Sequence, residues 1–121
     1  MIEGIIRASD DATVTLGVRG LGSAEFDFVI DTGFSDWLTL PEEIVRSLGL
    51  PFREENDYYL ADGSRVAIPV HTAEVNWMGQ WRRAMVLVME GSPLLGMSML
   101  RGCRMHMDVV PNGRVEIVPL G

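Results

Sequence analysis

The chain is poor in positive charge and contains no lysine. Its ten basic residues are all arginines, and 17 acidic residues leave a formal net charge of −7. Proteins that bind nucleic acids or anionic membranes present a basic surface to the phosphate groups. The charge balance therefore predicts that neither nucleic acid nor a membrane is a partner.

Cysteine and long hydrophobic runs are equally scarce. The single cysteine, Cys103, has no partner for a disulfide within the chain, which favours a reducing compartment. The longest apolar stretch, residues 84–89, is too short to cross a bilayer. The first residues lack the charged and apolar regions of a signal peptide. We therefore expect a cytoplasmic protein.

What is present is typical of one globular domain spanning residues 1–121. Hydrophobic residues make up 47% of the chain and charged residues 22%, which is enough apolar material for a modest core. Short apolar runs are separated by Gly, Asp-Gly and Asn-Gly turn signals. This pattern predicts strands at residues 2–8, 13–18, 24–30, 58–61, 65–77, 81–89, 103–109 and 114–118.

Two further segments have the end signals of helices. Residues 41–49 begin with proline, carry glutamates in the first turn and end with glycine. A shorter helix is expected at residues 97–101. Short strands with one or two short helices predict an all-β fold, a small closed or half-open barrel.

One tripeptide carries chemistry. Asp31-Thr32-Gly33 closes the apolar run 26–30, and Asp31 is the only acid of the chain in this setting. A buried strand would hold Asp31 at its end, Gly33 would allow a sharp turn, and the Thr32 hydroxyl would fasten that turn to a neighbour. Two such carboxylates brought close share one proton, so one acts as base and the other as acid. Short motifs also occur by chance, so the tripeptide alone favours a plain strand-to-loop turn.

Three segments, in order along the chain, resemble the retropepsin-like aspartic proteases, the single-domain relatives of pepsin. They are residues 28–40 with the helix that follows, the tetrapeptide Ala61-Asp62-Gly63-Ser64, and residues 93–100 with Leu94-Leu95-Gly96. The resemblance spans roughly residues 2–118 and is most specific at residues 31–33 and 94–96. It implies a retropepsin-like barrel with the activity of an aspartic endopeptidase.

The resemblance also implies a role for each motif. The active form would be a homodimer in which the two copies of Asp31 meet at the two-fold axis and activate a water molecule. Thr32 would hydrogen-bond across that axis, and Gly33 would support the turn. The other site residues would thread behind the catalytic turn (Leu94, Leu95 and Gly96) or form a flap over an extended polypeptide substrate (Ala61, Asp62, Gly63 and Ser64). No metal and no cofactor would take part.

Two departures from the family pattern leave other functions open. Phe34 stands where the family usually has Ser, Thr or Ala, and it cannot hydrogen-bond the catalytic carboxylate. The expected flap has one glycine, Gly63, beside the charged Asp62. The alternative is a retropepsin-fold interaction module that binds peptides with little or no proteolysis. A third hypothesis is a dormant enzyme domain that is activated only in a larger assembly.

Other polar residues have simpler interpretations. Asp36 and Asp62 lie among turn formers and are predicted to be turn and surface acids. Cys103 and His106 would project from opposite faces of one strand, so their spacing opposes metal ligation. The glycine cluster at residues 17–22 indicates a hairpin connection, because no helix follows it.

Overall fold

The computed structural model describes residues 1–121 and is mostly β, with 55% of the chain in strands and 8% in helices. The elements follow in the order β1 (Ile2–Ile6), β2 (Ala12–Arg19), β3 (Ser23–Ile30), β4 (Leu38–Leu40), α1 (Glu42–Ser47), β5 (Phe52–Tyr59), β6 (Arg65–Trp77), β7 (Gln80–Val88), β8 (Leu94–Leu95), α2 (Met97–Leu100), β9 (Cys103–Met107) and β10 (Arg114–Pro119). Neither helix has the length and apolar character that a membrane crossing requires.

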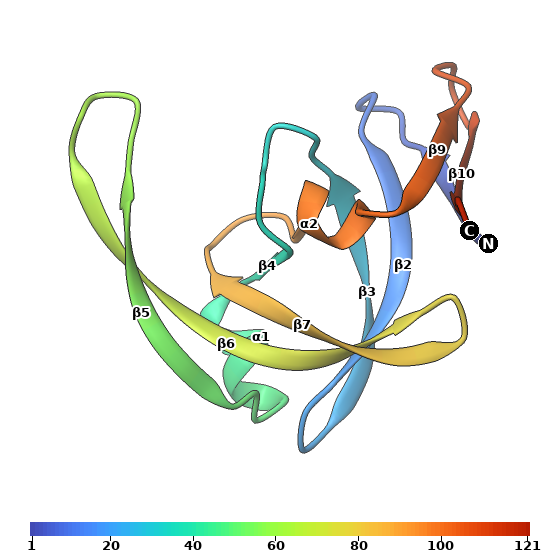
Figure 1. Cartoon of the computed structure of the whole chain (residues 1–121). Coiled ribbons are helices and arrows are strands. Elements are labelled where there is room, and N and C mark those ends of the chain that lie inside the picture. The colour runs from blue at the N-terminus through green and yellow to red at the C-terminus, as the bar shows by residue number, and fades with distance from the viewer.

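Six of the strands form a closed barrel (Figure 1). Going round it, β2 pairs with β3, β3 with β8, β8 with β4, β4 with β7, β7 with β6, and β6 with β2 again. The β3–β8 and β4–β7 pairs are parallel, and the other four are antiparallel. The closing contact between β2 and β6 is short, with two residue pairs, Val18 with Val75 and Arg19 with Glu74.

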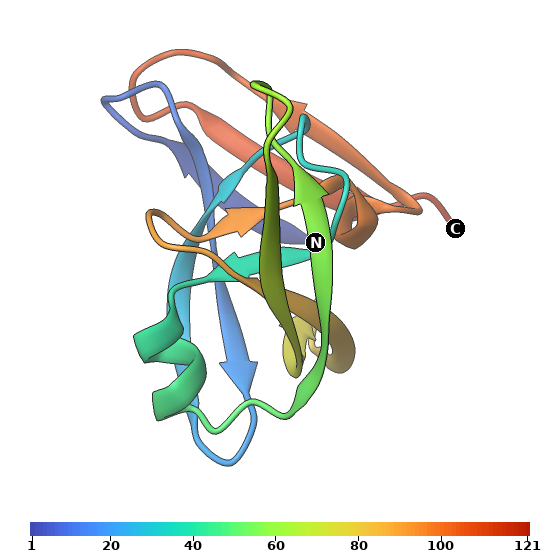
Figure 2. The ribbon, with the colours of Figure 1, turned by 90° about the vertical axis from the view of Figure 1, so that its left-hand side faces the viewer.

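The remaining strands extend the barrel at two places. β5 pairs with β6 to form a long hairpin that curves away from the barrel at the left of Figure 1 and lies in front of it in Figure 2. Beyond β2, the sheet continues through β1 and β10 to β9, which is an edge strand. The barrel therefore carries one projecting hairpin and one added sheet.

Alternation along the strands builds the core. Val14, Leu16 and Val18 of β2 are buried and point inward, and Phe28 of β3 and Leu95 of β8 are also fully buried. Burying one such side chain contributes about 1.5–3 kcal/mol to the free energy of unfolding. The core therefore fixes the end of β3, which the Asp-Thr-Gly tripeptide follows.

The structure confirms the predicted class, an all-β barrel with two short helices, and corrects some elements. β5 runs over Phe52–Tyr59, whereas the sequence predicted a strand at residues 58–61. Most of β5 is exposed and lacks apolar alternation, so pairing with β6 defines it instead. The prediction also missed β4 and β8, because strands of three and two residues show no periodicity.

Candidate active site at the Asp31 turn

Asp31 directly follows β3 and is held by hydrogen bonds on both sides. Its N–H donates to the carbonyl oxygen of Leu95 at 2.9 Å, and its carbonyl oxygen accepts a bond from the Phe34 N–H at 3.1 Å. The N–H of Gly33 donates to Oδ1 of the Asp31 carboxylate at 2.9 Å. A charge-assisted bond of this kind fixes the orientation of a carboxylate. Asp31 is therefore a half-buried acid in a defined position at the end of β3, a strand in which only Phe28 is buried, whereas the sequence predicted a buried strand.

Thr32 and Gly33 form the exposed crest of this turn. No hydrogen bond within the chain engages the Thr32 hydroxyl, and the Gly33 N–H is the one donor to the Asp31 carboxylate. The crest thus presents a carboxylate and a free hydroxyl on the surface of the single chain.

β8 lies between β3 and β4 and supports the turn from behind. Leu95 pairs in parallel with Ile30 of β3 and in antiparallel orientation with Leu38 of β4. The N–H of Leu94 donates to the hydroxyl of Thr39 at 2.9 Å, and Thr39 is buried. Thr39 therefore anchors β8, a role that the sequence did not reveal because it depends on a contact between distant strands.

Gly96 lies directly against the loop that follows the turn. A Cβ at this position would collide with the carbonyl oxygen of Asp36 and would lie 2.6 Å from Cδ2 and 2.7 Å from the carbonyl oxygen of Phe34. Atoms at these distances overlap, so no side chain fits without moving the loop backbone. The close approach therefore requires glycine at position 96.

The residues after β8 fasten the same loop with four hydrogen bonds. All four consecutive carbonyl oxygens of residues 34–37 accept a bond from residues 96–98. The bonds run from Gly96 N–H to Trp37 (2.8 Å), Met97 N–H to Phe34 (2.8 Å), Ser98 N–H to Asp36 (3.1 Å) and Ser98 Oγ to Ser35 (2.6 Å). The loop is consequently attached along its whole length to the segment behind it.

Phe34 links this loop to the base of the β5–β6 hairpin. Its half-buried ring packs against a small apolar cluster of Ile68, Val70 and Leu87. Such contacts are hydrophobic and place no donor on Asp31. Phe34 thus contributes to packing, and the Asp31 carboxylate relies on the Gly33 N–H alone.

The tip of the β5–β6 hairpin is formed by Ala61, Asp62, Gly63 and Ser64. The Asp62 carboxylate accepts hydrogen bonds from the N–H and the hydroxyl of Ser64, at 2.8 and 2.6 Å. These bonds, first that of the hydroxyl, lower the pKa of the Asp62 carboxyl below its ordinary value. Gly63 has φ of +86°, a conformation that favours glycine. Residues 61–67 are all exposed, so the tip packs against no other element.

One side-chain hydrogen bond joins the hairpin to the loop after Asp31. The Tyr58 hydroxyl donates to Oδ2 of Asp36 at 3.3 Å. Burial raises the pKa of Tyr58, and the neighbouring Asp36 charge adds to this effect. Asp36 is half-buried, whereas the sequence predicted a surface acid. The difference arises because β5 extends over Tyr58 and brings a donor to Asp36.

Metal-binding groups do not gather at this site. No set of three or more His, Cys, Asp or Glu side chains is arranged to hold a metal ion. Cys103 is half-buried against the core, and His106 of the same strand is exposed, as their alternation predicts. Asp31 lines none of the five main cavities of the chain. The half-buried Asp31 side chain therefore lies outside these cavities in the single chain.

Comparisons of the chain with models of protein families, with curated proteins and with solved structures found no match. The function proposed below is accordingly based on the sequence motifs and on the geometry of the Asp31 turn.

Proposed function

We propose that this protein is an aspartic endopeptidase with a retropepsin-like barrel, active as a homodimer. The observation that carries the proposal is the Asp31 turn, in which the Leu95 carbonyl accepts a bond from the Asp31 backbone N–H and the Gly33 N–H holds the Asp31 carboxylate, at the end of β3. Each chain has one such carboxylate. A second Asp31, from a second copy of the chain, completes the pair that the chemistry needs.

The paired carboxylates would share one proton, because like charges at short distance do not both ionise. The ionised carboxylate removes a proton from water as the water oxygen attacks the peptide carbonyl carbon, and the protonated one donates to the carbonyl oxygen. Proton transfer to the amide nitrogen then lets the C–N bond break, which releases a carboxylic acid and an amine. The pair ends with one proton, as it began.

The surroundings of Asp31 suit this chemistry. The free Thr32 hydroxyl is available for a hydrogen bond across the two-fold axis. The exposed hairpin tip at residues 61–64 can close over an extended peptide held as an added strand. The loop at residues 34–37 is fixed by residues 96–98, so the carboxylate would keep its position while the hairpin moves.

The test is cleavage of an unfolded-protein mixture by wild type and Asp31→Asn, read by mass spectrometry. We expect Asp31→Asn to abolish cleavage and leave the fold intact, because the amide cannot act as base. Asp10→Asn is the matched control, since Asp10 is an exposed turn residue with φ of 69°, which asparagine also adopts. Equal cleavage by wild type and Asp31→Asn would show that the mechanism is wrong.

The same assay across acid to neutral pH tests the shared proton. Activity requires one ionised and one protonated carboxylate, so the profile of kcat/KM should be bell-shaped. A flat profile through neutral pH would contradict a carboxylate pair.

A second candidate function is a peptide-binding module of the same fold with little or no proteolysis. The packing of Phe34 against the hairpin base favours it, because this leaves a single donor on the Asp31 carboxylate. Sedimentation equilibrium separates the two functions. A protein that stays monomeric at high concentration cannot bring two Asp31 carboxylates together and would be the binding module.

A further inference from the structure

Two strand ladders stop short of each other along one edge of β2. On this edge β1 pairs with residues 12–14 and β6 pairs with residues 18–19, whereas β3 pairs with the opposite edge over residues 13–19. Residues 15–17 therefore have a strand partner on one side only. Three residues at about 3.3 Å each leave an opening of about 10 Å between β1 and β6.

Alternation identifies the backbone groups that face this opening. The N–H and the carbonyl of Ile6 in β1 both bond to the turn before β10. The backbone groups of Ile6 therefore point away from β2, and those of the neighbouring Ile5 point toward Thr13. Successive residues of a strand face alternate sides. Thr15 and Gly17 therefore turn their backbone groups toward the opening, as Thr13 does toward β1.

A cavity of about 460 Å³ occupies the opening. This volume lies within the range of small-ligand sites. Its lining includes Thr15 and Gly17 of β2. It also includes Glu3 and Asn76, which would pair with Thr15 and Gly17 if β1 and β6 continued their pairing with β2 by one more residue each. Trp81 forms one wall, since a Cβ on Gly17 would lie 3.6 Å from its Cη2 atom. The unfinished ladders thus produce a defined pocket, which contains no residue of the Asp31 turn.

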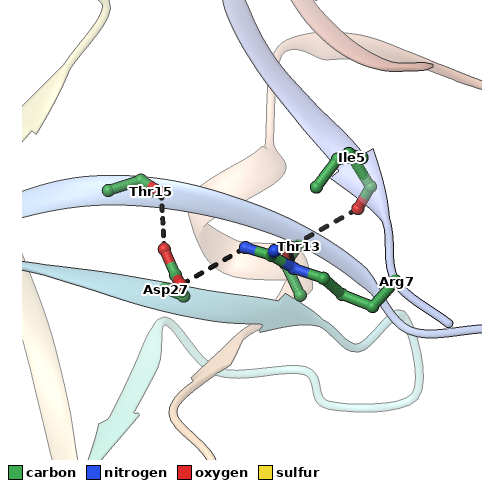
Figure 3. A network of polar contacts seen from close by, with 5 residues as sticks. All are labelled: Ile5, Arg7, Thr13, Thr15 and Asp27. Atoms are coloured by element: carbon green, nitrogen blue, oxygen red, sulfur yellow. Dashed lines mark hydrogen bonds and ion pairs between the residues drawn. The ribbon is translucent and has the colours of Figure 1, made fainter. Parts of the chain in front are cut away.

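The residues that line this pocket carry two negative charges, on Glu3 and Glu25, against one positive group, the N-terminal amine of Met1. Glu3 and Glu25 both contribute to the lining, and neither forms an ion pair. Asp27, the next outward acid of β3, differs. Its carboxylate accepts a bond from the Thr15 hydroxyl and pairs with Arg7 at 3.3 Å (Figure 3). Glu3 and Glu25 therefore remain available for a cation from outside the chain.

We propose that this pocket binds an arginine or lysine side chain of a partner polypeptide. Glu3 and Glu25 would supply the opposite charge, and the open Thr15 carbonyl would accept a hydrogen bond from the cationic head group. A whole added strand does not fit, because β1 and β6 occupy the same edge at either end. The net charge of −7 would also attract a basic segment.

The test is calorimetric titration of the Asp31→Asn protein with two pentapeptides that differ only in arginine against citrulline. Citrulline keeps the shape of arginine and lacks its charge. We expect the arginine peptide to bind at least about tenfold more tightly at low salt. Absence of binding by the arginine peptide, or equal binding of both peptides, would overturn the proposal. Because Asp31→Asn cannot cleave the peptide, the result is independent of the proposed protease activity.

A pair of double variants shows whether the pocket is responsible. Glu3→Gln/Glu25→Gln should weaken binding of the arginine peptide about tenfold. The control Glu43→Gln/Glu55→Gln changes the net charge equally at two exposed acids without ion pairs and should leave binding nearly unchanged. Equal weakening by both variants would show that overall charge causes the binding, and it would contradict a role for the pocket.

Discussion

The loop after Asp31 and the tip of the β5–β6 hairpin both carry residues of the proposed site, but they are held very differently. Residues 34–37 receive four hydrogen bonds from residues 96–98, and Gly96 lies against their backbone. The hairpin tip at residues 61–64 is exposed and bonds only within its own turn. The chain thus combines a fixed loop beside the carboxylate with an exposed hairpin tip of low local stability, which suits the gating role proposed for this tip.

Substituting one glycine in each region should show the largest difference in stability between the loop and the hairpin tip. Gly96→Ala places a methyl group in the backbone of the loop and should lower the free energy of unfolding by about 3 kcal/mol. Gly63→Ala meets nothing within 4 Å but must hold φ of +86°, which costs about 1–2 kcal/mol. Urea denaturation followed by tryptophan fluorescence measures both. Equal losses would show that the loop adapts as freely as the tip.

A threonine pair separates support within the chain from contact outside it. Thr39→Val leaves the half-buried Leu94 N–H without its acceptor and should lower the free energy of unfolding by about 1–2 kcal/mol. Thr32→Val removes an exposed hydroxyl without a partner and should change monomer stability by less than about 0.5 kcal/mol. In sedimentation experiments the same variant should weaken the proposed dimer, and an unchanged dimer would contradict a Thr32 contact across the axis.

The bond between Tyr58 and Asp36 is the point at which the two regions can be uncoupled. Tyr58→Phe should lower the free energy of unfolding by only about 0.5–1 kcal/mol. Amide exchange should become faster at residues 58–67 and stay unchanged at residues 94–98. Tyr59→Phe is the control, because the Tyr59 side chain is 75% exposed. Because burial raises the pKa of Tyr58, the contribution of this group should be complete below the ordinary pKa of tyrosine and be lost progressively as pH rises through the raised value.

The smallest expected effect concerns the Asp62 turn at acid pH. The Ser64 bonds lower the pKa of Asp62, so they stabilise the turn above the ordinary pKa of the carboxyl and are lost as pH falls through the lowered value. NMR titration should show faster Ser64 amide exchange at low pH with the barrel amides unaffected. In Asp62→Asn this step should be absent. If the Asp62→Asn variant showed the same pH-dependent change in Ser64 amide exchange, that change would come from another titrating group.

How far the sequence predicts this molecule depends on whether the signal is local. The apolar run before Asp31 and the glycine after Leu94-Leu95 identify both segments that the fold brings together. The Thr39–Leu94 bond joins residues 55 positions apart, and the Tyr58–Asp36 bond joins residues 22 positions apart. Neither bond produces a pattern in the sequence from which it could be predicted. The polar strand β5 was misplaced for the same reason, since its partner β6 defines it.

The short contact between β2 and β6 has a consequence for how the chain reaches this fold. Only two residue pairs close the barrel there, and Arg19 and Glu74 are 55 positions apart. The β2–β3 and β6–β7 hairpins on either side need only short loops. Closing a long loop costs more chain entropy than closing a short one, so nonlocal pairings form slowly. In the folded barrel, Arg19 of this closing contact also stacks 4.0 Å above the Trp81 ring. We therefore expect the hairpins to form early in folding and the barrel to close last.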